Sequence, residues 1–135
     1  MKCVIVVDET LPIGLLTNTA AALALSLGNH VSGLIGPDVA DGDGRMHKGI
    51  TAVPIPILAA NQAAIQDLLS KSQGATESGL TVLGFSDVAQ SCKHYDEYIE
   101  KMKAAKADDI DYLGLCLYGP RKKVSSLCGQ MKLLR

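Results

Sequence analysis

The stretch Lys2-Cys-Val-Ile-Val-Val7 decides the fold class of this chain. It is a continuous apolar run rich in β-branched residues, and such runs are typical of strands that helices cover on both faces. A segment rich in leucine and alanine follows from Leu15 to Leu27, and its apolar side chains recur at helical spacing. We therefore predict a central strand over residues 2–7, a mostly buried helix over residues 15–27, and a C-cap for that helix at Gly28.

Strand-like and helix-like segments alternate along the rest of the chain. Further strands are predicted over about residues 53–58, 80–85 and 112–118, and further helices after Asn61, over residues 95–107 and after Pro120. This alternation predicts an α/β fold, a three-layer α/β/α sandwich around a mixed, mostly parallel four-stranded sheet.

Local signals mark the ends and faces of these helices. Asn61 is a suitable N-cap and Gly74 a suitable helix end. Tyr95, Ile99 and Met102 recur at helical spacing, which predicts an amphipathic helix with these three residues on one face.

Residues 33–57 differ in composition from the rest of the chain. Asp41-Gly-Asp-Gly44 is a strong turn signal, and Pro54 and Pro56 place two missing N–H groups on one side of the backbone, which suits an edge strand. We predict a peripheral β-hairpin in this segment. No metal site is predicted, because a calcium-binding loop needs a glutamate near the position of Ala52.

Length, charge and cysteine spacing narrow the class of protein. A chain of 135 residues has the usual size of one domain, and its 13 Lys and Arg nearly balance its 14 Asp and Glu. Because no overall positive field results, nucleic acid binding gains no support from charge.

The first residues contain no apolar run long enough for an export signal or a membrane span. The four cysteines lack C-x-x-C spacing, and free thiols are typical of a reducing compartment, so we expect a cytoplasmic protein.

The two ends of the chain resemble the type II peptidyl-tRNA hydrolases. Residues 2–7, followed by Gly14 and an alanine-rich helix, resemble the first strand, loop and helix of that family. At the other end, Gly119-Pro120 and Gly129-Gln-Met-Lys-Leu133 resemble its closing turn and the end of its last helix. The resemblance implies the same fold, with the last strand antiparallel to the others.

The whole chain is similar to a family of uncharacterised bacterial proteins assigned to that fold. The matching stretches include Gly33-Leu-Ile-Gly-Pro-Asp38, Asp41-Gly-Asp-Gly-Arg45, Phe85-Ser-Asp-Val-Ala-Gln-Ser-Cys92 and Tyr95-Asp-Glu-Tyr98. They are spread over nearly the full length of the chain. This resemblance implies a domain of unknown function with an added peripheral β-hairpin.

The sequence departs from the hydrolases at their catalytic loop. Those enzymes carry a Lys-x-Gly-Lys-x-Lys loop, then a glutamine and a histidine, and the corresponding positions here are Pro12, Gly14, Leu15, Thr17, Ala21 and Ala24. Only the glycine is kept. Positioned charges of this kind usually supply the largest part of catalysis, so the resemblance implies a fold without peptidyl-tRNA hydrolysis.

Ligands of α/β sheets favour the C-terminal ends of parallel strands, which directs attention to the residues that follow the predicted strands. The candidate binding residues are Asp8, Asn18, Ser86, Asp87, Gln90 and Cys92. Asp8 and Asp87 also suit a structural role, because short acidic side chains commonly cap turns and helix starts. Cys92 and His94 stand two residues apart, a spacing that does not bring a thiol into contact with an imidazole, and no catalytic residue is assigned.

Three functions are compatible with these observations. The resemblance and the missing lysines favour a diverged binding domain for a small molecule or a protein, working as a homodimer. An enzyme of unknown reaction at the strand ends is one alternative. A non-hydrolytic RNA-binding protein that uses the basic cluster Arg121–Lys123 is the other, although the charge balance makes nucleic acid an improbable partner. No pattern in the chain indicates a cofactor.

Overall fold

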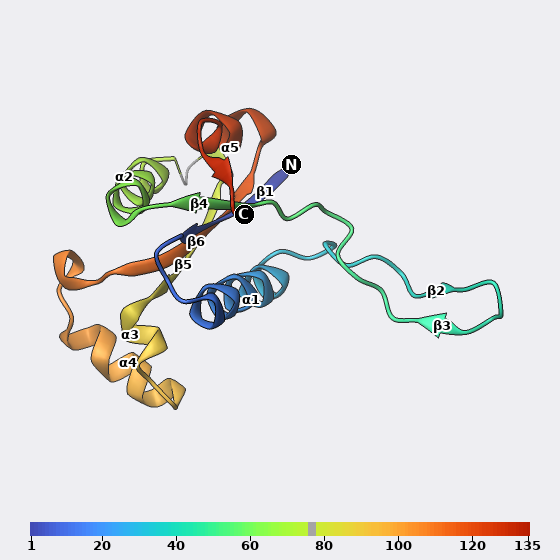
Figure 1. Ribbon diagram of the computed structural model, residues 1–135, viewed down its shortest axis with the longest axis horizontal. Helices are drawn as coiled ribbons and strands as arrows, with labels where there is room; N and C mark the ends of the chain where they lie inside the picture. The colour runs from blue at the N-terminus through green and yellow to red at the C-terminus, as the bar shows by residue number, and fades with distance from the viewer. Residues whose placement is uncertain (76–77) are drawn as a thin grey trace.

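Strand β1 (Lys2–Asp8) lies in the middle of a five-stranded sheet in the computed structural model, which describes residues 1–75 and 78–135 (Figure 1). The strands follow the order β5-β6-β1-β4-β7. The other four strands are β4 (Ile57–Ala60), β5 (Thr81–Ser86), β6 (Tyr112–Gly119) and β7 (Lys132–Leu133). The predicted central position of the first strand is therefore confirmed.

Helices cover both faces of this sheet. Helix α1 (Ile13–His30) lies on one face, and α2 (Gln62–Gln73) and α5 (Arg121–Cys128) lie on the other (Figure 1). Alternate side chains of β1 enter the two cores, so that Ile5 packs on the α1 side and Val6 on the α2 and α5 side. A strand buried on both faces needs a continuous apolar sequence, which is why this run shows no polar alternation.

The sheet is mixed, but the prediction of a mostly parallel, four-stranded sheet is wrong. Among the described strands, β1 and β4 form the parallel pair, while β6 is antiparallel to both β1 and β5, and β7 is antiparallel to β4. The antiparallel direction of the strand at 112–118 is confirmed. Strands β1 and β5 run in the same direction, but β6 lies between them and is antiparallel to each. They therefore do not form a parallel pair. Strand β7 has two residues, too few for a periodic signal.

Two predicted element ends differ from the structure. Helix α1 continues through Gly28 to His30, and its last turn closes with the Val31 N–H donating to the Leu27 carbonyl. The prolines precede β4, which is an inner strand between β1 and β7 rather than an edge strand. Pro56 still contributes to the sheet, because its carbonyl accepts a hydrogen bond from the Ile5 N–H.

The helix predicted over 95–107 is α4 (Tyr95–Ala104), and it follows the short helix α3 (Asp87–Gln90). Its apolar face does not enter the core, since Tyr95 is 73% exposed and Ile99 40% exposed. Amphipathic spacing gives a helix an apolar face without saying what covers it. The predicted ends of α2 are confirmed, with Asn61 accepting from the Ala64 N–H and Gly74 at the C-terminus.

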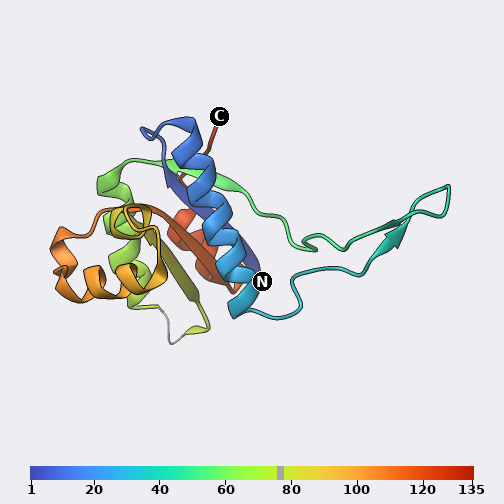
Figure 2. The ribbon, with the colours of Figure 1, turned by 90° about the horizontal axis from the view of Figure 1, so that it is seen from below.

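The predicted peripheral hairpin is confirmed and projects away from the sheet (Figure 2). Strands β2 (Val39–Ala40) and β3 (Met46–His47) form its outer part, and an isolated bridge between Ile35 and Thr51 forms its base. We call residues 33–53 the arm. Its turn is built as the sequence predicts, with Asp41 accepting from the N–H groups of its own turn.

All four cysteines are free, and two of them lie close together on the same face of the sheet. Cys3 and Cys116 are buried in neighbouring strands with their sulfur atoms 4.0 Å apart. Burial also raises the pKa of the Cys128 thiol to about 11. The burial predicted for Cys3 and Cys116 is confirmed.

Candidate functional site

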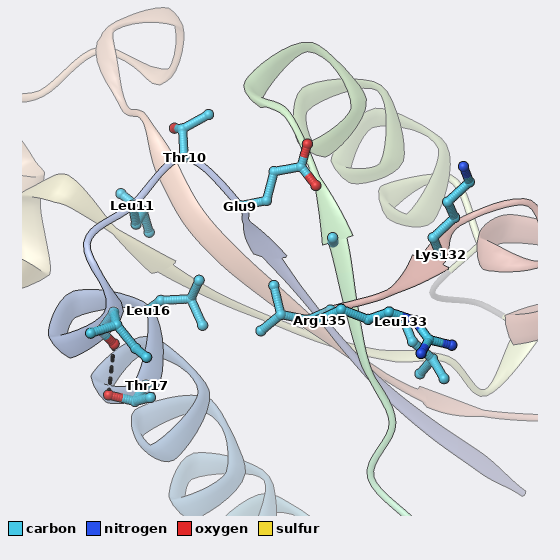
Figure 3. Close-up of a pocket in the computed structure, with 11 residues that line it drawn as sticks. Glu9, Thr10, Leu11, Leu16, Thr17, Lys132, Leu133 and Arg135 are labelled. Atoms are coloured by element: carbon cyan, nitrogen blue, oxygen red, sulfur yellow. Dashed lines mark hydrogen bonds between the residues drawn. The ribbon is translucent and has the colours of Figure 1, made fainter.

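A pocket of about 850 Å³ opens where the parallel strands β1 and β4 end (Figure 3). The loop from β1 to α1 forms one wall, and the C-terminal segment forms the other. Its lining residues are Glu9, Thr10, Leu11, Ile13, Leu16, Thr17, Ala59, Lys132, Leu133, Leu134 and Arg135. The volume lies within the range of about 300–1,000 Å³ that small-molecule sites occupy. We call this the strand-end pocket.

The charges of the strand-end pocket lie at its rim. Lys132 and Arg135 come from the C-terminal segment, and neither forms an ion pair within the described part of the chain. Glu9 projects from the opposite loop (Figure 3). Leucines from both walls lie between these groups, so the pocket combines an apolar surface with two cations and one anion.

The N-terminus of α1 adds a partial positive charge to the same pocket. Its N-cap residue is Pro12, no side chain accepts from the first N–H groups, and no acidic residue lies in the first turn. Helix N–H groups without an acceptor favour a negatively charged neighbour. The Thr17 hydroxyl group is not free to serve as a donor elsewhere, because it donates to the carbonyls of Ile13 and Gly14.

Asp8 is buried beside the strand-end pocket and holds its loop in place. Only 5% of the residue is exposed. The carboxylate accepts hydrogen bonds from the Thr10 N–H at 2.9 Å, from the Thr10 hydroxyl at 2.7 Å and from the Gln62 amide at 2.9 Å. Burial raises the pKa of Asp8, but the hydrogen bonds from Gln62 and Thr10 lower it by more, so the pKa lies below the ordinary value. Asp8 is thus an ionised anchor of the β1–α1 loop.

Gln62 connects the ends of three elements. Its amide nitrogen donates to Asp8 and also to the Tyr112 carbonyl at 2.8 Å, which joins β1 and α2 to the start of β6. The two acceptors of this nitrogen fix the orientation of the amide group. The amide oxygen is buried and has no hydrogen-bond partner among the described residues.

Ser86 and Asp87 occupy structural positions at the end of β5. Ser86 is buried and caps α3 by accepting from the Ala89 N–H. Asp87 accepts from the N–H groups of Val88 and Asp111, which joins α3 to the segment before β6. These contacts match the capping role that short polar side chains take at such junctions.

The remaining candidates are Asn18, Gln90 and Cys92, which lie on the α1 side of the sheet. Asn18 of α1 donates to the Gln90 side chain of α3 at 3.3 Å. Cys92 lines a pocket of about 370 Å³ with Phe85 and Tyr98 among its neighbours, and its thiol donates to the Val88 carbonyl. Alternate residues of a strand face opposite sides of a sheet, and Asp8 therefore lies on the α2 side, away from this group. The six candidates share one edge of the sheet but do not form one cluster.

Sequence reasoning missed Lys132, Arg135 and Gln62. Two of them reach the strand-end pocket because the C-terminal segment pairs with β4, with Leu58 opposite Leu133. The segment Lys132-Leu-Leu-Arg135 matches no motif. The sequence therefore contained no signal that these two cations reach the pocket. Gln62 stands in the first turn of α2, and its partners Asp8 and Tyr112 are distant in the sequence.

The basic cluster Arg121–Lys123 lies at the opposite edge of the sheet from the strand-end pocket. It follows β6, whose last residue, Gly119, pairs with Lys2 at the start of β1. In the part of the chain that the structure describes, no three histidine, cysteine or carboxylate side chains gather as in a metal site. In the arm, the His47 ring nitrogen lies 2.8 Å from an Asp41 carboxylate oxygen.

Comparison with known proteins places the chain in a family. No curated protein is detectably similar to it. A solved structure of a protein of unknown function from Agrobacterium tumefaciens strain C58 has the same fold, with a TM-score of 0.84 and 20% identity over 98% of this chain and 96% of that chain. Within residues 1–75 and 78–135, none of the helices is long and apolar enough to cross a membrane. The sequence matches one family along its whole length, residues 1–135, and the chain therefore belongs to the proteins of unknown function grouped as DUF2000.

Proposed function

We propose that this protein is a binding domain for a small organic acid, which occupies the strand-end pocket. The observation that carries the proposal is that one pocket is lined both by Lys132 and Arg135, which have no ion-pair partner in the described residues, and by the first residues of α1, whose N-terminus is uncapped. Oriented N–H groups and cationic side chains are the groups that bind carboxylates and phosphates.

The shape of the pocket indicates a ligand with an apolar body. Leu11 and Leu16 line one wall, and Leu133 and Leu134 line the other. Sites of this size bury most of a metabolite on apolar side chains and orient it through a few polar groups. Asp8 and Gln62 do not line the pocket, and we assign them the positioning of its loop.

We expect an amphipathic acid such as hexanoate or phenyl phosphate to bind here, and hexylamine, which has the opposite charge, to bind far more weakly. Titration of the protein with these probes, followed by backbone amide NMR, should shift the signals of residues 9–17 and 132–135. Replacing both Lys132 and Arg135 by glutamine should weaken binding by about a hundredfold or more, because each charge-assisted hydrogen bond contributes roughly 1.5–3 kcal/mol.

The double substitution Arg121→Gln and Lys122→Gln is the matched control. It removes the same two charge types from the opposite edge of the sheet. Affinity should stay unchanged in this variant. An equal loss in both variants would show a nonspecific charge effect, and the absence of any shift around the pocket with every acid would refute the proposed site.

We also propose that the fold is that of the type II peptidyl-tRNA hydrolases and that their activity is missing. The antiparallel β6, the Gly119-Pro120 turn before α5 and the position of Gly14 at the start of α1 support the fold assignment. The loop positions that the hydrolases fill with lysine hold Pro12, Leu15 and Thr17, and none of these supplies a positive charge.

The purified protein should release no detectable amino acid from an N-blocked aminoacyl-tRNA. Each lost electrostatic donor typically costs about a hundredfold or more in rate, and three are missing. A variant with Pro12, Leu15 and Thr17 all changed to lysine tests whether charge alone restores any turnover. Robust turnover by the unchanged protein would overturn this assignment.

A further inference from the structure

We propose that the arm and the outward face of α1 form the interface with a second copy of this chain, the arm of each copy lying along α1 of the other. The proposal does not depend on which ligand the strand-end pocket binds, although the two surfaces share Ile13 and Thr17 at the start of α1. It rests on three features: the position of the arm, the composition of α1, and the match between the lengths of the two elements.

The arm extends into solvent as a bare hairpin. It leaves the body beyond the C-terminal end of α1 and touches no other element along most of its length (Figures 1 and 2). The apolar side chains of Ile35, Val39, Met46 and Ile50 are exposed on it, with Ile35 and Val39 on one face of the hairpin and Met46 and Ile50 on the other. A two-stranded hairpin alone is marginally stable in water, so an arm of this kind needs a surface to lie on.

The arm belongs to the fold and is not a local insertion. The solved structure from Agrobacterium tumefaciens matches 98% of this chain, which includes the arm. Two carboxylates of the arm are paired within the arm itself: Asp38 lies 3.7 Å from the Lys48 ammonium and accepts from the Gly49 N–H, and Asp41 pairs with His47. Charges paired in this way leave the apolar side chains available for contact.

Helix α1 offers a surface that suits this arm. None of its 18 residues is Asp, Glu, Lys or Arg, although it lies on the outside of the protein. Its exposed side includes a row of residues four apart, Ile13, Thr17, Ala21 and Leu25, with Leu25 80% exposed, beside the uncharged polar residues Asn18 and Ser26. Surface helices ordinarily carry charged residues on the side away from the core, and an outward face that is small and apolar is typical of an interface.

The dimensions of the two surfaces agree. The 18 residues of α1 span about 27 Å, and the arm from Ile35 to its turn spans about 25 Å at about 3.3 Å per residue. Because the arm starts at the C-terminal end of α1, a two-fold axis near its base lays each arm along the other copy's helix. The arm and the outward side of α1 together reach the size of about 20–30 residues a side that stable interfaces use. A two-fold dimer of this kind needs two complementary surfaces on the same chain, and the arm and the outward side of α1 supply them.

Sedimentation velocity of the full chain tests the proposal. We expect a dimer, with twice the 14.2 kDa mass of the chain, at micromolar concentration. Leu25→Glu and Ile50→Lys should each weaken the dimer by about tenfold or more, because each buries an unpaired charge in the interface. Both side chains are exposed, Ile50 by 78%, so circular dichroism and the thermal midpoint of the monomers should match those of the wild type.

Tyr95→Glu is the matched control, because Tyr95 is 73% exposed on α4, outside the proposed interface. It should leave the dimer intact. Mixing the Leu25→Glu and Ile50→Lys variants should restore dimers, since the new carboxylate of one copy then meets the new ammonium of the other near the base of the arm. A monomeric wild type, a dimer broken by Tyr95→Glu alone, or a mixture that stays monomeric would overturn the proposal.

Discussion

Replacing Gly114 by valine is expected to lower the free energy of unfolding by about 3 kcal/mol or more, because the site has no room for a side chain. Gly114 lies in β6 directly beneath α1. A Cβ atom at this position would lie 2.8 Å from the Thr19 methyl group, 2.9 Å from the Val6 carbonyl oxygen and 3.2 Å from Leu23. The Val6 oxygen belongs to the neighbouring strand backbone, so relief requires a shift of the sheet or of the helix.

Guanidinium denaturation followed by circular dichroism measures this loss. Gly28→Ala in α1 is the control, because nothing lies within 4 Å of a Cβ built there. Gly28 stands inside the helix, so alanine should raise stability by roughly 0.5–1 kcal/mol. If the Gly114→Val protein were as stable as the wild type, α1 would not pack on β6 as closely as described.

Replacing Asp8 by leucine is expected to cost about 2–4 kcal/mol at neutral pH, because three part-buried hydrogen bonds to an ionised acceptor are lost. The Thr10 N–H and hydroxyl both donate to this carboxylate, and Gln62 keeps only its bond to the Tyr112 carbonyl. The end of β1 and the start of α2 should loosen together. Glu9→Leu is the control, because the neighbouring Glu9 side chain is exposed and forms no ion pair in the described residues.

The cost of Asp8→Leu should depend on pH in a defined direction. Hydrogen bonds hold the pKa of Asp8 below its ordinary value, so folding favours the ionised carboxylate. Its contribution is complete above the unfolded pKa of about 3.9 and is lost as the pH falls through the lower pKa of the folded state. The stability difference between the wild type and Asp8→Leu should therefore narrow below about pH 4 in denaturation series. A difference that stays constant down to strongly acidic pH would refute the ionised state of Asp8.

Local sequence determined most of the elements and their order. The apolar run at 2–7 forms a strand buried on both faces, and Asn61 caps α2 through a contact to Ala64 three residues away. The turn of the arm also follows from its own Asp and Gly residues. In each case the interacting groups are neighbours in the chain, so the pattern of residue types contains the interaction.

Only the tertiary structure decided what those elements contact. Lys132 and Arg135 meet the loop after β1 because β7 pairs with β4, and the need for a glycine at 114 arises from the approach of α1. The face of α4 that contains Tyr95 has the spacing of a buried face and yet is exposed. Periodicity shows which side of an element is apolar. Contacts between residues distant in the sequence decide the pairing partners, the strand directions and the location of a site, and no local pattern contains these contacts.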